Sequence, residues 1–202
     1  MRIAHRRASA LGDELSQFPE SFWQGYVMGL AVHGQLTVVR PATDDDVDLL
    51  VAWHADPEVS RYWDDETYTP EQMRARLERE PIDAWIVEEG GEPVGFLQSW
   101  QEIGVGSTEP SSDTVHEPRR GGLDGFLVPD ARGRGLMPDA ARVLARSLLD
   151  AGWQYVTVDP YVWNERAVRG WRNAGFVEVS RNDPDADHVL PWVLMRFDPE
   201  SA

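Results

Sequence analysis

Apolar and polar residues follow two different periods along this chain, and together they predict strands interrupted by helices. Residues 36–40, LTVVR, are rich in β-branched side chains, which favours a strand. The stretch 42–56 has apolar residues at helical spacing, acidic residues near its start and Thr43 in position for an N-cap, so it predicts a helix. A second helix is predicted over residues 70–80, PEQMRARLERE.

The middle of the chain has the pattern of a β-hairpin. AWIVEE (84–89) and VGFLQSWQEI (94–103) are predicted strands, and the GGEP between them supplies turn residues. Residues 104–121 are rich in Gly, Ser, Pro and charge, so we expect a long loop, of the kind that often carries function. GGLDGFLV (121–128) is the fourth predicted strand.

The last third alternates helix and strand before a final hairpin. Helices are predicted over 138–151 and 164–175, with the strand WQYVTVD (153–159) between them. FVEVSR (176–181) and HVLPWVLMRF (188–197) are expected to pair across an acidic turn. The pattern amounts to about seven strands and about four helices, with helices separating some strands and hairpins joining others, so it predicts an α/β fold with a mixed sheet.

Composition is that of a single globular domain. The 202 residues are 42% hydrophobic and 27% charged, which is enough to fill one core. Residues 1–34 have no sustained period and are expected to be an N-terminal extension, with the domain over 35–202. The chain has no Cys, which excludes disulfides, thiolate metal sites and a Cys nucleophile and fits a cytoplasmic protein. We expect no metal cofactor.

Charge narrows the range of partners. The chain has 19 basic and 35 acidic side chains and a formal net charge of −16, which repels nucleic acid and anionic membranes and attracts cationic small molecules. The alternative is that the charge serves solubility only. No apolar run approaches the ~20 residues of a membrane span. We therefore expect a cationic small-molecule partner, no nucleic acid and no membrane, in a monomer or a homodimer.

The stretch VPDARGRGLMPDAARVL (128–144) sets a cationic, Gly-rich turn at the start of a helix. Gly133 and Gly135 permit close backbone approach, and exposed N–H groups at a helix N-terminus attract phosphate. Arg132 and Arg134 offer charge-assisted bonds to phosphate oxygens. An ordinary solvated turn explains this stretch equally well, and a P-loop is excluded because no Gly-Lys-Ser/Thr follows.

A second stretch, VDPYVWNERAVRGWRNAGF (158–176), favours the phosphate interpretation. Taken together, the two stretches resemble the GCN5-related N-acetyltransferase (GNAT) superfamily, whose pyrophosphate loop reads R/Q-x-x-G-x-G/A and whose next helix carries N-x-x-A and ends in G-F. Arg132, Gly135 and the segment 164–176 match that pattern, whereas Met137 stands where the family has Gly or Ala. The resemblance spans about residues 36–198 and implies the GNAT fold, with a mostly antiparallel mixed sheet.

The resemblance also implies acetyl-CoA as co-substrate. Backbone N–H groups near Leu127 and Val128 are expected to hold the thioester carbonyl oxygen. Trp171 stands where many family members have a Tyr that protonates the leaving thiolate, so either water or a group such as Tyr161 does this, or turnover is slow. The residues expected to bind the cofactor are Phe126, Leu127, Val128, Arg132, Gly133, Arg134, Gly135, Leu136, Met137, Asn164, Ala167 and Trp171.

Within the superfamily, four segments look most like the aminoglycoside 6'-N-acetyltransferases. These are GEPVGFLQSWQEIG (91–104), GGLD (121–124), VDPYVWNERAVRGW (158–171) and the aromatic-acidic SRYWDDE (60–66). Siderophore-pathway acyltransferases share several of them. The closer resemblance therefore indicates an amine acceptor and favours an aminoglycoside.

Acetyl transfer to an amine needs the free base, so a carboxylate near the nitrogen is expected to orient it and take its proton. Asp124 interrupts an apolar strand and is the expected catalytic residue; the alternative is a satisfied edge carboxylate. The other candidates have alternatives to acceptor binding: core packing for Trp63 and Trp100, turn chemistry for Asp159, and plain surface charge for Asp65 and Glu102. The residues expected to bind the acceptor are Trp63, Asp65, Gln98, Trp100, Glu102, Asp124 and Asp159.

These observations predict an acetyl-CoA-dependent N-acetyltransferase acting on a primary amine of a cationic small molecule, foremost the 6'-amine of an aminoglycoside, which is antibiotic resistance by modification. Two alternatives stay open. One is N-acylation of a siderophore precursor or a polyamine. The other is a non-catalytic coenzyme A-binding protein, suggested by Trp171 and Met137.

Overall fold

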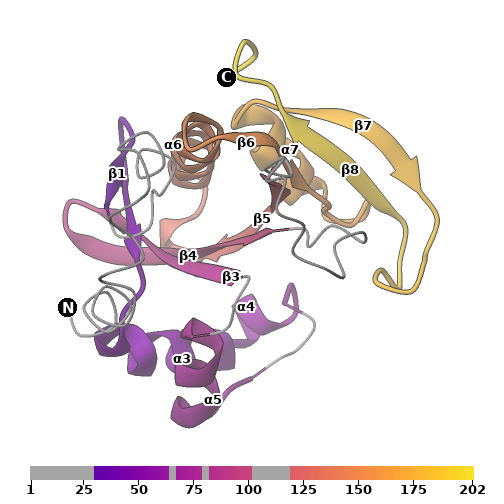
Figure 1. Cartoon of the computed structure of the whole chain (residues 1–202). Coiled ribbons are helices and arrows are strands. Elements are labelled where there is room, and N and C mark those ends of the chain that lie inside the picture. Colours follow the sequence, from indigo (N-terminus) through magenta and orange to yellow (C-terminus); the bar gives the residue numbers. More distant parts are fainter. Residues whose placement is uncertain (1–29, 64–66, 79–81, 102–118) are drawn as a thin grey trace, which may run out of the picture.

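A computed structural model describes residues 30–63, 67–78, 82–101 and 119–202 of the chain. Its eight strands form one sheet in the order β1-β2-β3-β4-β5-β6-β8-β7 (Figure 1). The strands are β1 (Val32–His33), β2 (Val38–Pro41), β3 (Ile82–Glu89), β4 (Glu92–Gln101), β5 (Arg119–Leu127), β6 (Trp153–Val158), β7 (Phe176–Asn182) and β8 (Trp192–Phe197).

All pairs of neighbouring strands are antiparallel except β5 and β6, which are parallel. The exception follows from the connection, because β5 and β6 are joined through a helix rather than a hairpin. The predicted α/β fold with a mostly antiparallel mixed sheet is therefore confirmed. The count is eight strands because Val32 and His33 pair with Val39 and Val38 at the edge of the sheet. That short strand lies inside the predicted extension, whose residues 1–29 lie outside the described chain.

Local capping explains where the helices begin. Thr43 and Asp46 form a capping box, which confirms the predicted helix start, and Asn164 accepts a hydrogen bond from the N–H of Ala167 at 3.1 Å. The four-residue α4 was not predicted from the periodicity. The helices are η2 (Asp44–Asp46), α3 (Val47–Ala55), α4 (Pro57–Ser60), α5 (Pro70–Leu77), η3 (Pro129–Ala131), α6 (Leu136–Asp150) and α7 (Glu165–Asn173).

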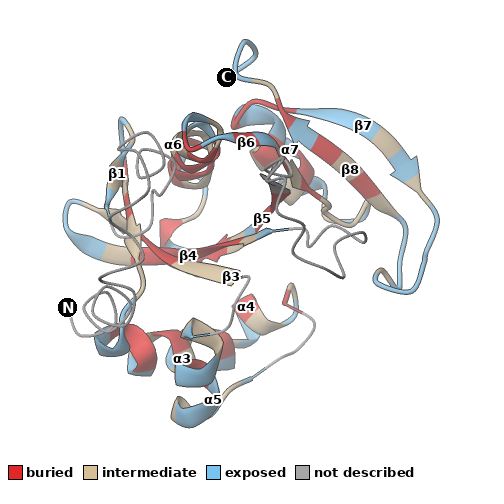
Figure 2. Cartoon of the chain, in the orientation of Figure 1, coloured by how far each residue is buried: buried red, intermediate tan, exposed pale blue. Residues whose placement is uncertain are grey.

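The sheet separates two apolar cores. Helices α3, α4 and α5 cover one face of the central strands and α6 covers the other (Figure 1). Because side chains alternate along a strand, β5 sends Phe126 to the first core and Leu123 and Leu127 to the second. The central strand β4 is mostly buried as a result (Figure 2).

Strands β5 and β6 diverge after a short paired segment. Their register runs only from Arg119 opposite Trp153 to Gly122 opposite Thr157. Beyond it, β5 stays paired with β4 as far as Leu127, whereas β6 pairs with β8. The divergence exposes one edge of β5 and leaves room between the two halves of the sheet.

Candidate active site

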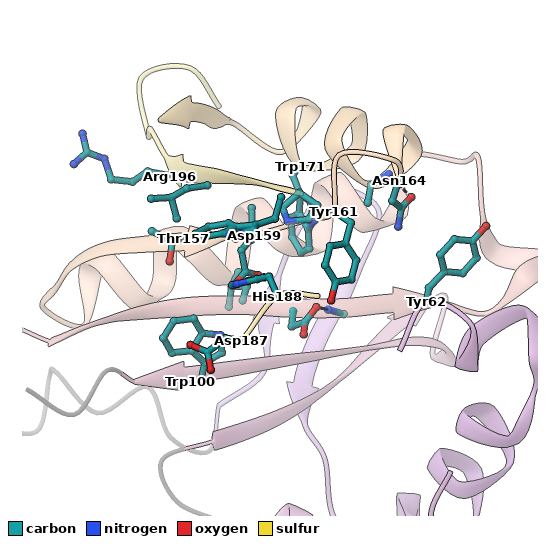
Figure 3. Close-up of a pocket in the computed structure, with 18 of the residues that line it drawn as sticks. Tyr62, Trp100, Thr157, Asp159, Tyr161, Asn164, Trp171, Asp187, His188 and Arg196 are labelled. Atoms are coloured by element: carbon teal, nitrogen blue, oxygen red, sulfur yellow. Dashed lines mark hydrogen bonds and ion pairs between the residues drawn. The ribbon is translucent and has the colours of Figure 1, made fainter. Parts of the chain in front are cut away.

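A cavity of about 880 Å³ opens where β5 and β6 diverge (Figure 3). Its walls come from the second half of β5, the end of β6, the helix α7 with its N-cap, the turn after α4, the β7–β8 connection and β8. Of the expected site residues, those that line it are Trp63, Trp100, Asp124, Phe126, Asp159, Asn164, Ala167 and Trp171.

The turn that leads into α6 has the backbone of an anion site. Gly133 and Gly135 adopt φ of 78° and 80°, a left-handed conformation that disfavours other residues, and Gly135 is the N-cap of α6. The N–H groups of the first helical turn have no acceptor within the helix and lie at the positive end of its dipole. The 15-residue α6 therefore offers a site for a phosphate group.

The two arginines of this turn hold the local structure together. Arg132 donates from Nε to the carbonyl of Leu127 at 3.0 Å and from Nη2 to the carbonyl of Glu58 at 2.7 Å, which ties the turn to β5 and α4. Arg134 forms an ion pair with Glu89 at 2.8 Å. Burial and the nearby Arg166 lower the pKa of Arg132. Its contact with phosphate stays a prediction, and so does that of Arg134.

Met137 departs from the Gly or Ala of the family motif without blocking the turn. Its half-buried side chain packs against the core between α6 and the sheet. Leu136 is also buried in that core, with 1% of its surface exposed. The side chain therefore points to the interior, and the backbone N–H of Met137 is the group left to face a ligand.

The register of β4 and β5 decides which N–H groups face the cavity. Val128 donates its N–H to the carbonyl of Val94 at 3.1 Å, so it does not offer this group to a thioester, contrary to the expectation for Val128. In an antiparallel pair, hydrogen-bonded and non-hydrogen-bonded residues alternate. Leu127, opposite Gly95, therefore directs its N–H away from β4 and toward the gap left by β6. Leu127 is the remaining candidate for the thioester carbonyl.

Three predicted acceptor residues share one face of β4 and β5. Gln98 is paired with Asp124, and Trp100 with Gly122. A Cβ on Gly122 would collide with the indole of Trp100, so this Gly lets the ring lie against the strand. Gln98 is buried and accepts a hydrogen bond from Arg76 at 2.8 Å.

Asp124 is an exposed carboxylate on the cavity wall. Its Oδ1 accepts the N–H of Gly125 at 3.0 Å, a bond that fixes the carboxylate next to the strand. Asp159, which follows β6, lines the same cavity. Two further predicted acids, Asp65 and Glu102, lie outside the described residues.

Trp63 and Trp171 are buried aromatic walls of the cavity. Trp63 is 8% exposed and packs edge-to-face on Phe126 at 5.5 Å, so it belongs to the core beneath the acceptor face. Trp171 is 7% exposed and packs edge-to-face on Phe176 at 5.4 Å. No phenol is present at this position, and the hydroxyl of Tyr161 points into the cavity nearby (Figure 3).

Sequence reasoning missed Asp139, which supports the phosphate turn. Its carboxylate accepts hydrogen bonds from the N–H groups of three consecutive residues, 35–37, and from the hydroxyl of Thr37. These contacts join the β1–β2 turn to the first turn of α6. A Cβ on Gly34 would collide with the Asp139 carboxylate, so this Gly is required where the two turns meet. An acid in a first helical turn is too common a signal to reveal this partner.

Sequence reasoning also missed His188, which lies in the β7–β8 connection and not in the strand predicted over 188–197. Its Nε2 lies 3.1 Å from Oδ2 of Asp159, and its Nδ1 lies 2.9 Å from Oδ1 of Asp185. The predicted cation-binding residue Asp159 therefore already holds a side chain from the β7–β8 connection. A contact between residues 29 positions apart leaves no local pattern in the sequence.

Two kinds of site are not found in the part of the chain that the structure describes. None of its helices has the length and apolar character to cross a bilayer. Nor do its His, Asp and Glu residues gather in groups of three that could hold a metal ion.

Comparison with known proteins agrees with the geometry. The acetyltransferase (GNAT) domain matches residues 42–183. Aminoglycoside N(6')-acetyltransferase type 1 of Klebsiella pneumoniae is 27% identical over 147 residues, which is 68% of this chain and 72% of that protein.

Solved structures agree as well. Aminoglycoside acetyltransferase AAC(6')-Ib with coenzyme A and kanamycin superposes with a TM-score of 0.65 and 25% identity, covering 82% of this chain and 96% of that one. An aminoglycoside N(6')-acetyltransferase from Legionella pneumophila shares the fold, with a TM-score of 0.62 and 19% identity over 81% of this chain and 92% of that one. The chain therefore belongs to the GNAT family of acetyl-CoA-dependent N-acetyltransferases.

Proposed function

We propose that this enzyme acetylates a primary amine of a cationic small molecule, and that the acceptor is the 6'-amine of an aminoglycoside. The observation that carries the proposal is the cavity between β5 and β6, which is lined by Asp124 from β5 and by Asp159 from the end of β6. A polyamine sugar brings several ammonium groups, and two carboxylates lining the same cavity suit them. The relative from Klebsiella pneumoniae, named for 6'-acetylation, supports this choice.

Acetyl-CoA would lie along the exposed edge of β5. The proposed pyrophosphate site is the turn 133–137, where N–H groups and the dipole of α6 attract anions. From there the pantetheine arm would run between the diverging strands, and the thioester carbonyl would accept the N–H of Leu127. Asn164 and Ala167 at the start of α7 line the other side of this path.

Asp124 would act on the acceptor amine. The amine nitrogen attacks the thioester carbon, a C–N bond forms, and the C–S bond breaks as the tetrahedral intermediate collapses. One proton passes from the nitrogen to the Asp124 carboxylate, directly or through water. Trp100 would stack on the sugar ring at the same face, where Gly122 gives its indole room.

The leaving thiolate needs a proton that Trp171 cannot supply, because an indole N–H is not an acid at neutral pH. We assign this role to Tyr161, whose hydroxyl points into the cavity beside α7 (Figure 3). A CoA thiol has an acidity near that of Cys, with a pKa of about 8.5, so the thiolate leaves without help at a reduced rate. The acid therefore sets the speed of turnover and not the identity of the acceptor.

A panel of acceptors tests the proposal. Steady-state rates would be measured with acetyl-CoA and kanamycin, with an aminoglycoside that has a 6'-hydroxyl in place of the amine, and with spermidine and a hydroxamate precursor. We expect turnover of kanamycin and none of the 6'-hydroxyl compound. Turnover of spermidine or the hydroxamate precursor, with none of any 6'-amino compound, would replace the aminoglycoside by that acceptor.

A further inference from the structure

The connection between β7 and β8, residues 183–191, folds back over the end of β6 and places His188 in the cavity wall. This connection is internally fixed. The carboxylate of Asp185 accepts the N–H groups of Asp187 and His188 at 2.9 Å and 2.8 Å, and Asp185 donates its own N–H to the carbonyl of His188 at 2.9 Å. The imidazole is therefore set in place by its own loop before it meets the rest of the site.

Each nitrogen of the His188 ring faces a carboxylate. Nε2 lies 3.1 Å from Asp159, at the end of β6, and Nδ1 lies 2.9 Å from Asp185. Carboxylate oxygens only accept hydrogen bonds, so both ring nitrogens donate and the ring is an imidazolium. Its side chain is 17% exposed and stacks on Trp192, with ring centroids 4.1 Å apart. Figure 3 shows the ring near Asp159 and Tyr161 inside the cavity.

The charges around His188 come from four elements. Asp185 and Asp187 belong to its own connection, Asp159 follows β6, Asp124 lies on β5 and Arg196 on β8. Burial by itself lowers the pKa of His188, but the hydrogen bonds that its ring donates to Asp185 and Asp159 outweigh burial and raise that pKa. The carboxylates therefore favour the charged form of the ring more than water does for a free imidazole.

We propose that His188 occupies, in the free enzyme, the carboxylate site on Asp159 that a positively charged amine of the acceptor takes over, so that acid weakens acceptor binding. This inference rests on the proposed function. The imidazolium and an ammonium group offer Asp159 the same positive charge and the same N–H donor, so the two compete for one carboxylate. His188 is then a residue that sets the affinity for cationic acceptors.

The pH dependence has a definite sign. When an ammonium group takes Asp159, His188 loses one of its two carboxylates, so its pKa falls in the complex relative to the free enzyme. Between the lower and the higher pKa, binding releases up to one proton, and acceptor affinity rises with pH by at most about tenfold per pH unit. Below the lower pKa and above the higher one, His188 no longer makes the acceptor affinity depend on pH.

Calorimetric binding of kanamycin to the enzyme saturated with coenzyme A, at about pH 6 and about pH 8, tests the proposal. The variants are His188→Gln, which removes the titration, and His33→Gln, a control at an exposed His on β1. Kanamycin loses some charge of its own over this range, so the informative quantity is the Kd of the wild type divided by that of each variant. For His188→Gln, we expect a ratio severalfold above one at the lower pH that approaches one at the higher pH. For His33→Gln, we expect a ratio near one at both.

A second readout follows His188 in the wild-type chain and does not depend on the variant folding. The ¹⁵N signals of its imidazole would be titrated with and without kanamycin, and we expect a lower pKa with kanamycin bound. Four outcomes would each overturn the proposal. These are equal Kd ratios at both pH values, weaker kanamycin binding by His188→Gln, a His188 pKa that kanamycin does not change, and no kanamycin binding by any variant. Binding that depends on His188 without any acetylation would instead overturn the proposed function and leave this inference standing.

Discussion

Replacing Asp139 tests how the turn before α6 is held in shape. Its Oδ2 accepts the N–H groups of Leu36 and Thr37 at 2.9 Å and 3.0 Å and the hydroxyl of Thr37 at 2.8 Å, whereas Oδ1 accepts the N–H of Gln35 at 3.0 Å. Asp139→Ala removes all four bonds. Asp139→Asn keeps one side-chain oxygen. If this oxygen takes the place of Oδ2, it still accepts the three hydrogen bonds from Leu36 and Thr37.

Burial of the donors sets the size of the effect. Thr37 is 3% exposed, so its N–H and hydroxyl cannot turn to water, whereas Gln35 and Leu36 are exposed and can. Two buried donors left unpaired cost about 1–3 kcal/mol each, so Asp139→Ala is expected to lower the free energy of unfolding by roughly 2–6 kcal/mol. Asp139→Asn loses only the bond to Gln35 and should lower it by about 1 kcal/mol.

Acid should remove the same stabilisation. Burial by itself raises the pKa of Asp139, but the hydrogen bonds from Leu36, Thr37 and Gln35 outweigh it and lower the pKa below 3.8. A carboxyl whose pKa is lower in the folded state stabilises the fold above its unfolded pKa, and this contribution is lost as pH falls through the folded pKa. In Asp139→Asn, this loss at acid pH should be absent.

Urea denaturation followed by Trp fluorescence measures these differences, and Asp150→Ala, at an exposed acid on the same helix, is the matched control. Acetyl-CoA affinity should fall with Asp139→Ala and stay unchanged with the control, because Asp139 joins the start of α6 to the β1–β2 turn and Asp150 lies at the other end of the helix. A loss of stability as small as that of the control would refute the reasoning, as would equal losses for Asn and Ala.

Three further changes have defined outcomes. Gly122→Ala should displace the indole of Trp100, so the KM for the acceptor should rise severalfold in steady-state kinetics with little change in acetyl-CoA affinity. An unchanged acceptor KM would remove Trp100 from the site. Tyr161→Phe should lower kcat by about 10- to 100-fold, and adding Trp171→Tyr should restore part of it if a phenol supplies the proton; single-turnover rates would measure both. Gly34→Ala should lower the denaturation midpoint about as much as Asp139→Ala, because its Cβ would collide with that carboxylate.

Patterns confined to neighbouring residues predicted much of the fold. Thr43 at the start of η2, Asn164 at the start of α7 and the glycines of the turn before α6 act through bonds within a few residues, so the sequence reveals them. β5 was predicted to begin at Gly121, because glycine favours loops, yet it begins at Arg119. A Cβ on Gly121 would collide with the carbonyl of Trp100 and the ring of Trp153, so this Gly is there for strand packing.

Contacts between distant segments escaped sequence reasoning. Asp139 binds residues more than a hundred positions earlier in the chain, and His188, in the connection of the final hairpin, reaches Asp159 at the end of β6. Neither contact has a spacing that a periodic pattern reveals. The N–H of Val128 was assigned to the thioester because the strand register was unknown, and the pairing with Val94 shows that it is occupied. Residue types thus indicated the chemistry, while the topology decided which groups are available for it.

The central claim is that Asp124 takes the proton from an acceptor amine held between β5 and β6, and the rate of acetyl transfer to kanamycin by the wild type and by Asp124→Asn tests it most directly. Asp130→Asn, at an exposed acid on η3, is the control. We predict a single acetyl group on the 6'-amine and a fall in kcat of about 100-fold or more for Asp124→Asn, with coenzyme A affinity unchanged. An Asp124→Asn enzyme that acetylates kanamycin at the wild-type rate would contradict the account.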